Sequence, residues 1–269
     1  MKCFIYAASA ALLVCSAIAC QKNADISPQL IGDTVLTKCS MFFHVTATNE
    51  QYPVRVNYWM TGKEISKISI EPGDTLYDFV RNDKGNLIHF RDQTATVKGE
   101  TTSASTYELS YTQDKITMIE NWQSFENGYS GVTTRFLTLK DSLITTIEEW
   151  DGQQLNEKTD YVYDASGNVI KEMRSVAKET ITYTYFKEYR NPLLINGECR
   201  LINFLFGAGS YMSPNYTATE TNKPDGNNAP NYTVIAKYVV NDHWGSFPTK
   251  VHASSDVETI DFSYDYSVR

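Results

Sequence analysis

The feature that most constrains this chain is a two-residue alternation of apolar and polar side chains, which recurs along most of its length. Clear alternating runs cover residues 54–58, 107–111, 181–185 and 260–268. In the last run, aliphatic and aromatic residues alternate with aspartate and serine. Successive side chains of a β-strand point to opposite faces, so each run predicts a strand with one buried and one wet face. The chain is therefore predicted to be all-β.

Short turn-forming sequences separate neighbouring runs. They lie at residues 113–115, 141–142 and 165–168. Tight links require antiparallel pairing, because a parallel crossover takes a dozen or more residues. We therefore expect residues 35–269 to form a single β-rich domain, an antiparallel meander forming a long curved sheet or open barrel. The curved sheet is favoured because the predicted strands differ in length.

One of these turns belongs to a weak internal repeat. Residues 80–88 and 162–170 share the same pattern, and a looser copy covers 240–247. The shared glycine, Gly85 or Gly167, is predicted to take a positive φ that closes a hairpin. The Asn or Asp three positions earlier is predicted to hydrogen-bond the turn backbone. Turn chemistry explains the repeat, whereas a calcium loop would need more carboxylates than these loops carry.

The segment from 191 to 207 departs from the alternation and is apolar nearly all round. In a short segment this indicates burial. We predict a short helix or apolar plug near 198–206, packed on the concave face of the sheet and ended by Gly207. Residues 208–232, rich in Asn, Pro, Gly and Thr, are predicted to be a long loop.

The N-terminus predicts export. A lysine at position 2 precedes an apolar run over residues 4–18, which is shorter than the roughly 20 residues that span a bilayer. This arrangement predicts a signal peptide over residues 1–19. Residues 16–20, Ser-Ala-Ile-Ala-Cys, resemble the lipobox of bacterial lipoproteins, which implies lipid attachment at Cys20 and a lipidated tether over 20–34. The alternatives are Cys15, which follows a bulkier valine, and an ordinary cleaved secretory protein.

Composition and cysteine spacing exclude several functions. The formal net charge of −8 argues against nucleic acid as a partner, because nucleic acid requires a basic surface. Cys39 and Cys199 are the cysteines beyond Cys20, and two unpaired thiols are favoured over a bridge. The sequence contains neither a C-x-x-C motif nor a zinc-hydrolase histidine pattern. We therefore expect no metal and no cofactor.

Catalytic motifs are equally sparse. The sequence contains no G-x-S-x-G nucleophile motif. A glycosidase would need two carboxyl groups roughly 5 to 10 Å apart. Glu148 and Glu149 are adjacent on a predicted strand and point to opposite faces, so they cannot form this pair with each other. Glu120 could pair with either of them across strands. We therefore predict no catalytic residues, and keep this pairing as an alternative.

Two tryptophans are the candidate ligand-binding residues. Trp122 and Trp150 each end a predicted strand and follow the similar phrases Ile-Glu-Asn and Ile-Glu-Glu. If the two hairpins stack in register, both indoles lie near one sheet edge. Exposed aromatic rings of this kind grip sugars or peptides. The alternative is cross-strand packing that only stabilises the sheet.

The order of motifs resembles a known family. Residues 161–169 look like the YD-type hairpin of secreted bacterial proteins, and 191–193 read Asn-Pro-Leu ahead of an apolar run. With the lipobox, the hairpin at 245–251 and the terminal Tyr-x-Tyr at 264–266, the chain is similar to the DUF4595-like lipoproteins of Bacteroidetes, whose function is unknown. The similarity covers roughly residues 75–267. It implies a Gram-negative envelope with the lipid in the outer membrane, and it brings no catalytic residues.

These observations favour a cell-envelope lipoprotein that acts as a non-catalytic binding or scaffolding module. Its expected partners are the membrane, through the N-terminal lipid, and a glycan, a peptide or an envelope protein. The face of the outer membrane and the oligomeric state are left open. The alternative is a secreted polysaccharide hydrolase with carboxylates converging near Glu120, Glu149 or His243. A structural or assembly role would be favoured by exposed edge strands.

Overall fold

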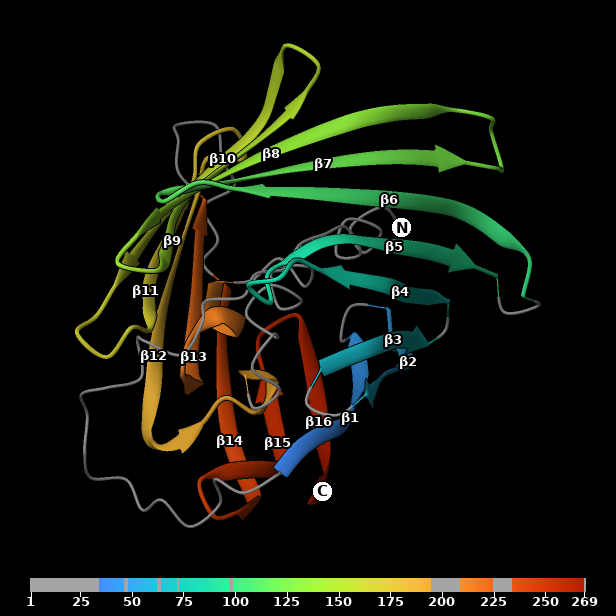
Figure 1. The fold of residues 1–269 in the computed structure, drawn as a ribbon. Helices are drawn as coiled ribbons and strands as arrows, with labels where there is room; N and C mark the ends of the chain where they lie inside the picture. Colours follow the sequence, from blue (N-terminus) through green and yellow to red (C-terminus); the bar gives the residue numbers. More distant parts are fainter. Residues whose placement is uncertain are drawn as a thin grey trace.

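The chain folds into a barrel of sixteen antiparallel β-strands (Figure 1). The computed structural model describes residues 34–45, 48–61, 64–71, 73–96, 99–194, 209–224 and 234–268. The predicted signal peptide, Cys20, Cys199 and the predicted plug at 198–206 lie outside these ranges. The described part contains no helix long and apolar enough to cross a bilayer.

The elements follow one another as a meander. They are β1 (Thr34–Val45), β2 (Glu50–Thr61), β3 (Glu64–Glu71), β4 (Asp74–Arg81), β5 (Leu87–Ala95), β6 (Thr101–Tyr111), β7 (Lys115–Ser124), β8 (Ser130–Lys140), β9 (Leu143–Asp151), β10 (Gln154–Tyr163), β11 (Val169–Arg174), β12 (Glu179–Arg190), the 3-10 helices η2 (Pro192–Leu194) and η3 (Gly209–Met212), β13 (Asn215–Pro224), β14 (Val234–Trp244), β15 (Phe247–Ser254) and β16 (Glu258–Val268).

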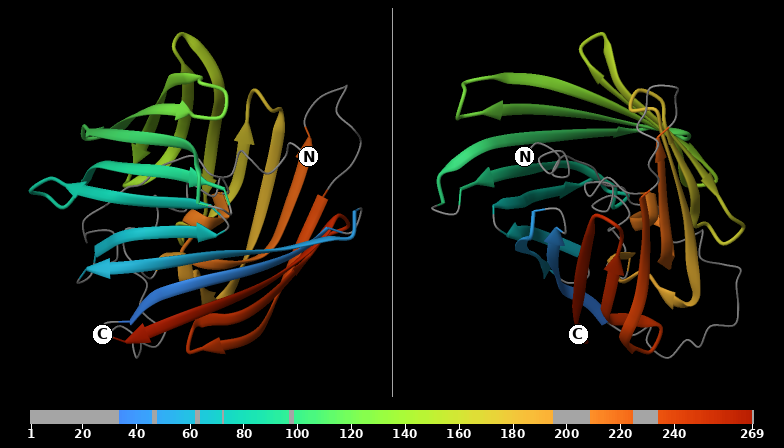
Figure 2. Two further views of the ribbon diagram at one scale, coloured as in Figure 1. Left: turned by 90° about the vertical axis from the view of Figure 1, so that its right-hand side faces the viewer. Right: turned by 180° about the vertical axis from the view of Figure 1, so that it is seen from behind.

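The predicted all-β antiparallel meander is confirmed, and its two ends join. Strand β1 pairs with β16 from Thr34 opposite Val268 to Val45 opposite Glu258, with one bulge between Leu36 and Lys38. Both terminal strands are long and both alternate, so each offers the other a full row of backbone donors and acceptors. The sheet therefore closes into a barrel instead of remaining the open curved sheet that the strand lengths favoured. The two views in Figure 2 show the closed ring of strands.

The loop predicted over 208–232 is wrong for residues 215–224, which form strand β13 between β12 and β14. Its sequence is rich in Thr, Asn, Glu and Lys, and these residues give a loop-like local signal. Backbone pairing with β12 and β14 stabilises the extended conformation that the local sequence does not favour. Residues 209–212, also assigned to the loop, form η3.

The alternation along the strands places mostly apolar side chains on the inner face of the barrel and mostly polar side chains on the outer face. On β7, Ile116 and Met118 are fully buried on the inner face, while Lys115 and Asn121 are exposed on the outer face. Among the described residues, the largest fully buried side chains are tyrosine, phenylalanine, methionine and aliphatic residues. They are Tyr107, Phe90, Leu36, Ile65, Ile68, Leu87, Ile116, Met118 and Leu137. The inner face is thus mainly apolar and the outer face mainly polar.

The chain enters the barrel after β12. Pro192 and Leu193 in η2 are buried, as are Gly209 and Met212 in η3. The backbone N–H of Gly209 donates to Glu172 Oε2 on β11 at 2.9 Å. Both flanks of the predicted plug are therefore held inside the barrel, although the plug itself lies outside the described residues.

The repeat predicts its turns correctly. Gly85 and Gly167 have φ of 78° and 82°. Asn82 Oδ1 accepts hydrogen bonds from the backbone N–H groups two and four positions later, both at 3.0 Å. Asp164 Oδ1 accepts the equivalent pair at 2.8 and 2.9 Å. The looser third copy keeps a positive φ at Gly245, but it closes a shorter turn between β14 and β15.

Candidate functional site

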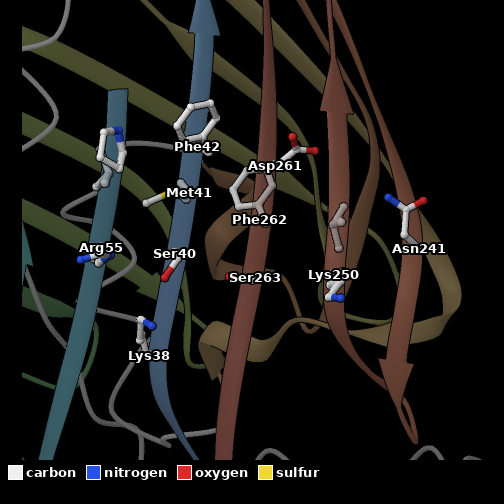
Figure 3. A pocket seen from close by; sticks show the side chains of 13 residues that line it. Lys38, Ser40, Met41, Phe42, Arg55, Asn241, Lys250, Asp261, Phe262 and Ser263 are labelled. Carbon is white, nitrogen blue, oxygen red and sulfur yellow. The ribbon is translucent and has the colours of Figure 1, made fainter. Parts of the chain in front are cut away.

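A hollow of about 440 Å³ lies on the outer face of the barrel, across the seam where β1 meets β16 (Figure 3). We call it the seam hollow. Five strands contribute to it: β1, β2, β14, β15 and β16. Its lining residues are Lys38, Ser40, Met41, Phe42, Pro53, Val54, Arg55, Asn241, Lys250, Val251, Asp261, Phe262 and Ser263.

A row of four residues crosses the seam hollow at right angles to the strands. Arg55 on β2 lies opposite Ser40 on β1, Ser40 lies opposite Ser263 on β16, and Ser263 lies opposite Lys250 on β15. Directly opposed residues point to the same face. Two small side chains therefore form a floor between two long cationic ones. Three strand steps of about 4.8 Å separate the two ends by roughly 14 Å at the backbone.

Two further side chains complete the walls. Phe42 lies between Pro53 on β2 and Asp261 on β16, and it is 43% exposed. Asn241 reaches the hollow from β14 on the side of Lys250 (Figure 3). The hollow therefore combines an exposed aromatic ring with hydroxyl and amide groups.

Cations outnumber carboxylates among the residues that line the seam hollow, although the whole chain carries a net charge of −8. Three cations line it, against one carboxylate. Lys38 Nζ lies 3.4 Å from Asp265, and an Arg55 guanidinium nitrogen lies 3.6 Å from Glu71. Lys250 forms no ion pair with the described residues, but Asp242 on β14 lies directly opposite it.

The lining carboxylate is itself engaged. Asp261 Oδ1 lies 2.7 Å from Nδ1 of His252, its neighbour on β15. This contact holds Asp261 at the side of the hollow near Phe42, away from the row between Arg55 and Lys250.

A second group of polar side chains lies inside the barrel, on β6 to β9. Arg135 is only 4% exposed, and its guanidinium donates to Glu120 Oε2 at 2.7 Å and to Glu149 Oε2 at 2.6 Å. Glu120 Oε1 also accepts hydrogen bonds from the hydroxyls of Ser105 and Tyr107, each at 2.9 Å. Every member of this inner network points to the same face across four neighbouring strands.

The inner network fixes the positions of the two candidate carboxylates, Glu120 and Glu149. Glu120 and Glu149 do approach across strands, as the sequence left open, but a guanidinium stands between them. Burial alone would lower the pKa of Arg135, while the two carboxylates raise it above its ordinary value. Each carboxylate acts as an acceptor toward a permanent cation. His243 is elsewhere, at the end of β14, with Nδ1 2.9 Å from the carbonyl oxygen of Gly245.

A third carboxylate near this network is poorly compensated. Asp92 on β5 is buried, and its Oδ1 has no hydrogen-bond partner among the described residues. Burial, with the charges of Asp74 and Glu120, raises the pKa of Asp92 to about 8. Across the described ranges, no three His, Cys, Asp or Glu side chains gather closely enough to hold a metal ion.

The two candidate tryptophans do not lie on the same face of the sheet. Trp122 lies on the inner face with Glu120, and its indole covers Gly131 on β8, where an added Cβ would meet the ring at 2.6 Å. Trp150 lies opposite Thr134 and points outward. Both are half-buried. The structure thus separates them by the thickness of the sheet.

Each tryptophan also has a feature of its own. Trp122 lines a second hollow of about 420 Å³ over β6, β7 and β8. Trp150 has a buried Nε1 with no hydrogen-bond partner among the described residues. The packing of Trp122 on Gly131 corresponds to the cross-strand alternative that the sequence left open.

Cys39, one of the two thiols considered in the sequence, lies within the described residues. Cys39 is a free cysteine buried on the inner face of β1. Burial raises its pKa to about 12, so the thiolate that would attack or bind a metal is strongly disfavoured.

No protein-family model matches the chain, and no curated protein sequence matches it. Among solved structures, it is similar to a porin-like protein from Bacteroides uniformis, with 10% identity over 86% of this chain and 98% of that one and a TM-score of 0.43. A porin-like protein from Bacteroides vulgatus gives 13% identity over 87% and 99%, also with a TM-score of 0.43.

Proposed function

We propose that this chain is a cell-envelope lipoprotein, anchored by a lipid on Cys20, whose barrel is a non-catalytic binding module. The observation that carries the proposal is the sorting of side chains between the two faces of the barrel. A barrel that spans a membrane has an apolar outer band about 25 Å tall and a polar interior. Here the outer rows of β7, β12, β15 and β16 are mostly Lys, Thr, Ser, Asn and Asp, and the core is mainly apolar.

This distribution suits a barrel that lies in water, so membrane attachment falls to another part of the chain. The lipobox-like sequence ending at Cys20 supplies it. Several acyl chains on one cysteine give stable anchoring, because each buried methylene contributes about 0.8 kcal/mol. The resemblance to outer-membrane lipoproteins of Bacteroidetes supports the outer membrane as the location.

Binding is favoured over catalysis by the state of the candidate carboxylates. Glu120 and Glu149 are both engaged by Arg135, whereas the seam hollow offers unused polar groups on an accessible face. Binding is also favoured over assembly by strand addition. That mode needs an unpaired sheet edge, and each of the sixteen described strands pairs on both sides.

Lipid labelling and fractionation in a Gram-negative host test the proposal. The full chain should incorporate labelled palmitate and sediment with membranes. Cys20→Ala should lose the label and appear, folded, in the soluble periplasmic or secreted fraction. Cys15→Ala is the matched control and should behave like the parent chain. Cys20→Ala protein that has lost the leader of residues 1–19 and still remains in carbonate-washed membranes would overturn the proposal, because it would place the barrel itself in the bilayer.

A further inference from the structure

We infer that the seam hollow binds an acidic carbohydrate, an oligosaccharide that carries carboxylate groups. The inference rests on the proposed function and names the ligand class of that binding module. It starts from the row of Arg55, Ser40, Ser263 and Lys250, which places two cations at the ends of a floor built from small polar side chains.

The spacing of the cations selects an elongated ligand. About 14 Å separates the backbone positions of Arg55 and Lys250, as three strand steps require. A compact anion such as phosphate would contact one end and leave the other unused. A chain of sugars with repeated carboxylates reaches both ends at once.

Both end cations are available to a ligand. Lys250 forms no ion pair in the described part of the chain, although Asp242 lies opposite it on β14. The 3.6 Å contact of Arg55 with Glu71 joins side chains that are each more than half exposed. An exposed pair of this kind is worth little and exchanges readily. The planar guanidinium of Arg55 can then bind a carboxylate through two parallel hydrogen bonds.

The other groups of the hollow favour a sugar over other polyanions. The hydroxyls of Ser40 and Ser263 and the amide of Asn241 can donate to and accept from ring hydroxyls. The exposed ring of Phe42 offers a flat apolar surface for a sugar face. Asp261, held by His252, lies beside Phe42 and repels a carboxylate there, so the unit over Phe42 is expected to be uncharged. Nucleic acid is disfavoured because its phosphate backbone needs an extended basic surface, whereas three cations line this hollow.

The test uses the full Cys20→Ala chain, purified without detergent, and isothermal titration calorimetry at low salt. The probes are a galacturonic acid tetramer and the same tetramer with its carboxylates methyl-esterified. The acid should bind, and the ester should bind at least about tenfold more weakly because it lacks the charges at both ends. Binding of the acid should weaken as salt is added.

Substitutions locate the site. Arg55→Gln and Lys250→Gln should each weaken binding of the acid by about fivefold, and Ser263→Leu should weaken it by filling the floor. Lys237→Gln is the matched control, since Lys237 is exposed on the outer face of β14 but does not line the hollow. Its affinity should be unchanged, and all variants should keep the parent circular dichroism spectrum.

Three outcomes would overturn the inference: equal affinity for acid and ester, acid binding unaffected by both end substitutions, or no acid binding together with capture by phosphatidylglycerol vesicles through Arg55 and Lys250. Each leaves the lipid-labelling result for Cys20 unchanged. Failure of the ligand class is thereby distinguished from failure of the proposed anchored module.

Discussion

At the scale of single residues, the interior of the barrel depends on how its few buried charges are compensated. Arg135 satisfies two carboxylates, and Glu120 gains two further hydroxyl donors. Sequence alone indicated Glu120 and Glu149 as residues that could meet across strands. It gave no sign of Arg135, because nothing local marks a strand arginine as an inward-facing partner.

Removing this arginine should be costly. Arg135→Met leaves Glu120 buried without its cation and should lower the free energy of unfolding by about 3 to 5 kcal/mol. Urea denaturation of the Cys20→Ala chain measures this. Arg55→Gln, on the exposed outer face, serves as the control and should change stability by about 0.5 kcal/mol or less. A loss below about 1 kcal/mol for Arg135→Met would contradict the inner network.

Asp92 should make stability depend on pH. Its pKa is raised to about 8 in the folded state, against about 3.9 when unfolded. The folded state therefore binds the proton of Asp92 more tightly than the unfolded state does. Its contribution to the free energy of unfolding is complete below about pH 4 and is lost as the pH rises toward 8. Asp92→Asn stays neutral, so its stability relative to the parent should rise by at least about 1 kcal/mol from pH 5 to pH 8.

Urea denaturation at both pH values measures the effect of Asp92→Asn. Asp256→Asn, an exposed turn substitution, should show no such trend. A difference between Asp92→Asn and the parent chain that stays constant from pH 5 to pH 8 would show that Asp92 does not titrate as its burial requires.

At the scale of elements, strong alternation of apolar and polar residues predicted strands. Turns were predicted where Gly, Asn or Asp can take a positive φ or hydrogen-bond the turn backbone. The turn at Asp141 and Ser142 is an example, since both take the positive φ of a two-residue hairpin turn. Prediction failed for β13, whose polar residues depend on neighbouring strands for their conformation. It also failed to place Trp122 and Trp150 on opposite faces, because the local sequence does not reveal the register that sets Trp122 opposite Gly131 and Trp150 opposite Thr134 on β8.

The repeated hairpin gives an element-scale prediction. Gly167 has φ of 82° and open space around its missing Cβ. Gly167→Ala should therefore destabilise the chain through backbone conformation alone, by about 1 kcal/mol. Thermal unfolding measures this, with Ser166→Ala in the same exposed turn as the control. Equal melting temperatures for Gly167→Ala and the parent chain would count against the turn geometry.

At the scale of the whole molecule, the decisive event is the pairing of the first strand with the last. Alternation is compatible with an open or a closed sheet, so the sequence could not settle closure. The seam hollow could not be predicted from the sequence for the same reason. Its row joins Ser40 and Arg55 to Lys250 and Ser263, which are far apart in the sequence and meet only once β1 lies beside β16.

Closure also determines which face each side chain presents to solvent. With β1 and β16 joined, apolar residues such as Val56 and Phe262 share one interior, and no described strand is left with an unpaired edge. The shared interior and the seam hollow both follow from this single pairing.

A cross-link across the seam tests that pairing most directly. Ser40→Cys combined with Ser263→Cys places two thiols on directly opposed residues, within the Cα separation that a disulfide spans. Oxidation should join the two strands, and mass spectrometry of tryptic peptides should recover the linked pair. Ser40→Cys with Ser69→Cys on β3 is the control and should not link. Absence of the Ser40–Ser263 cross-link in folded protein would contradict the closed barrel and everything built on its seam.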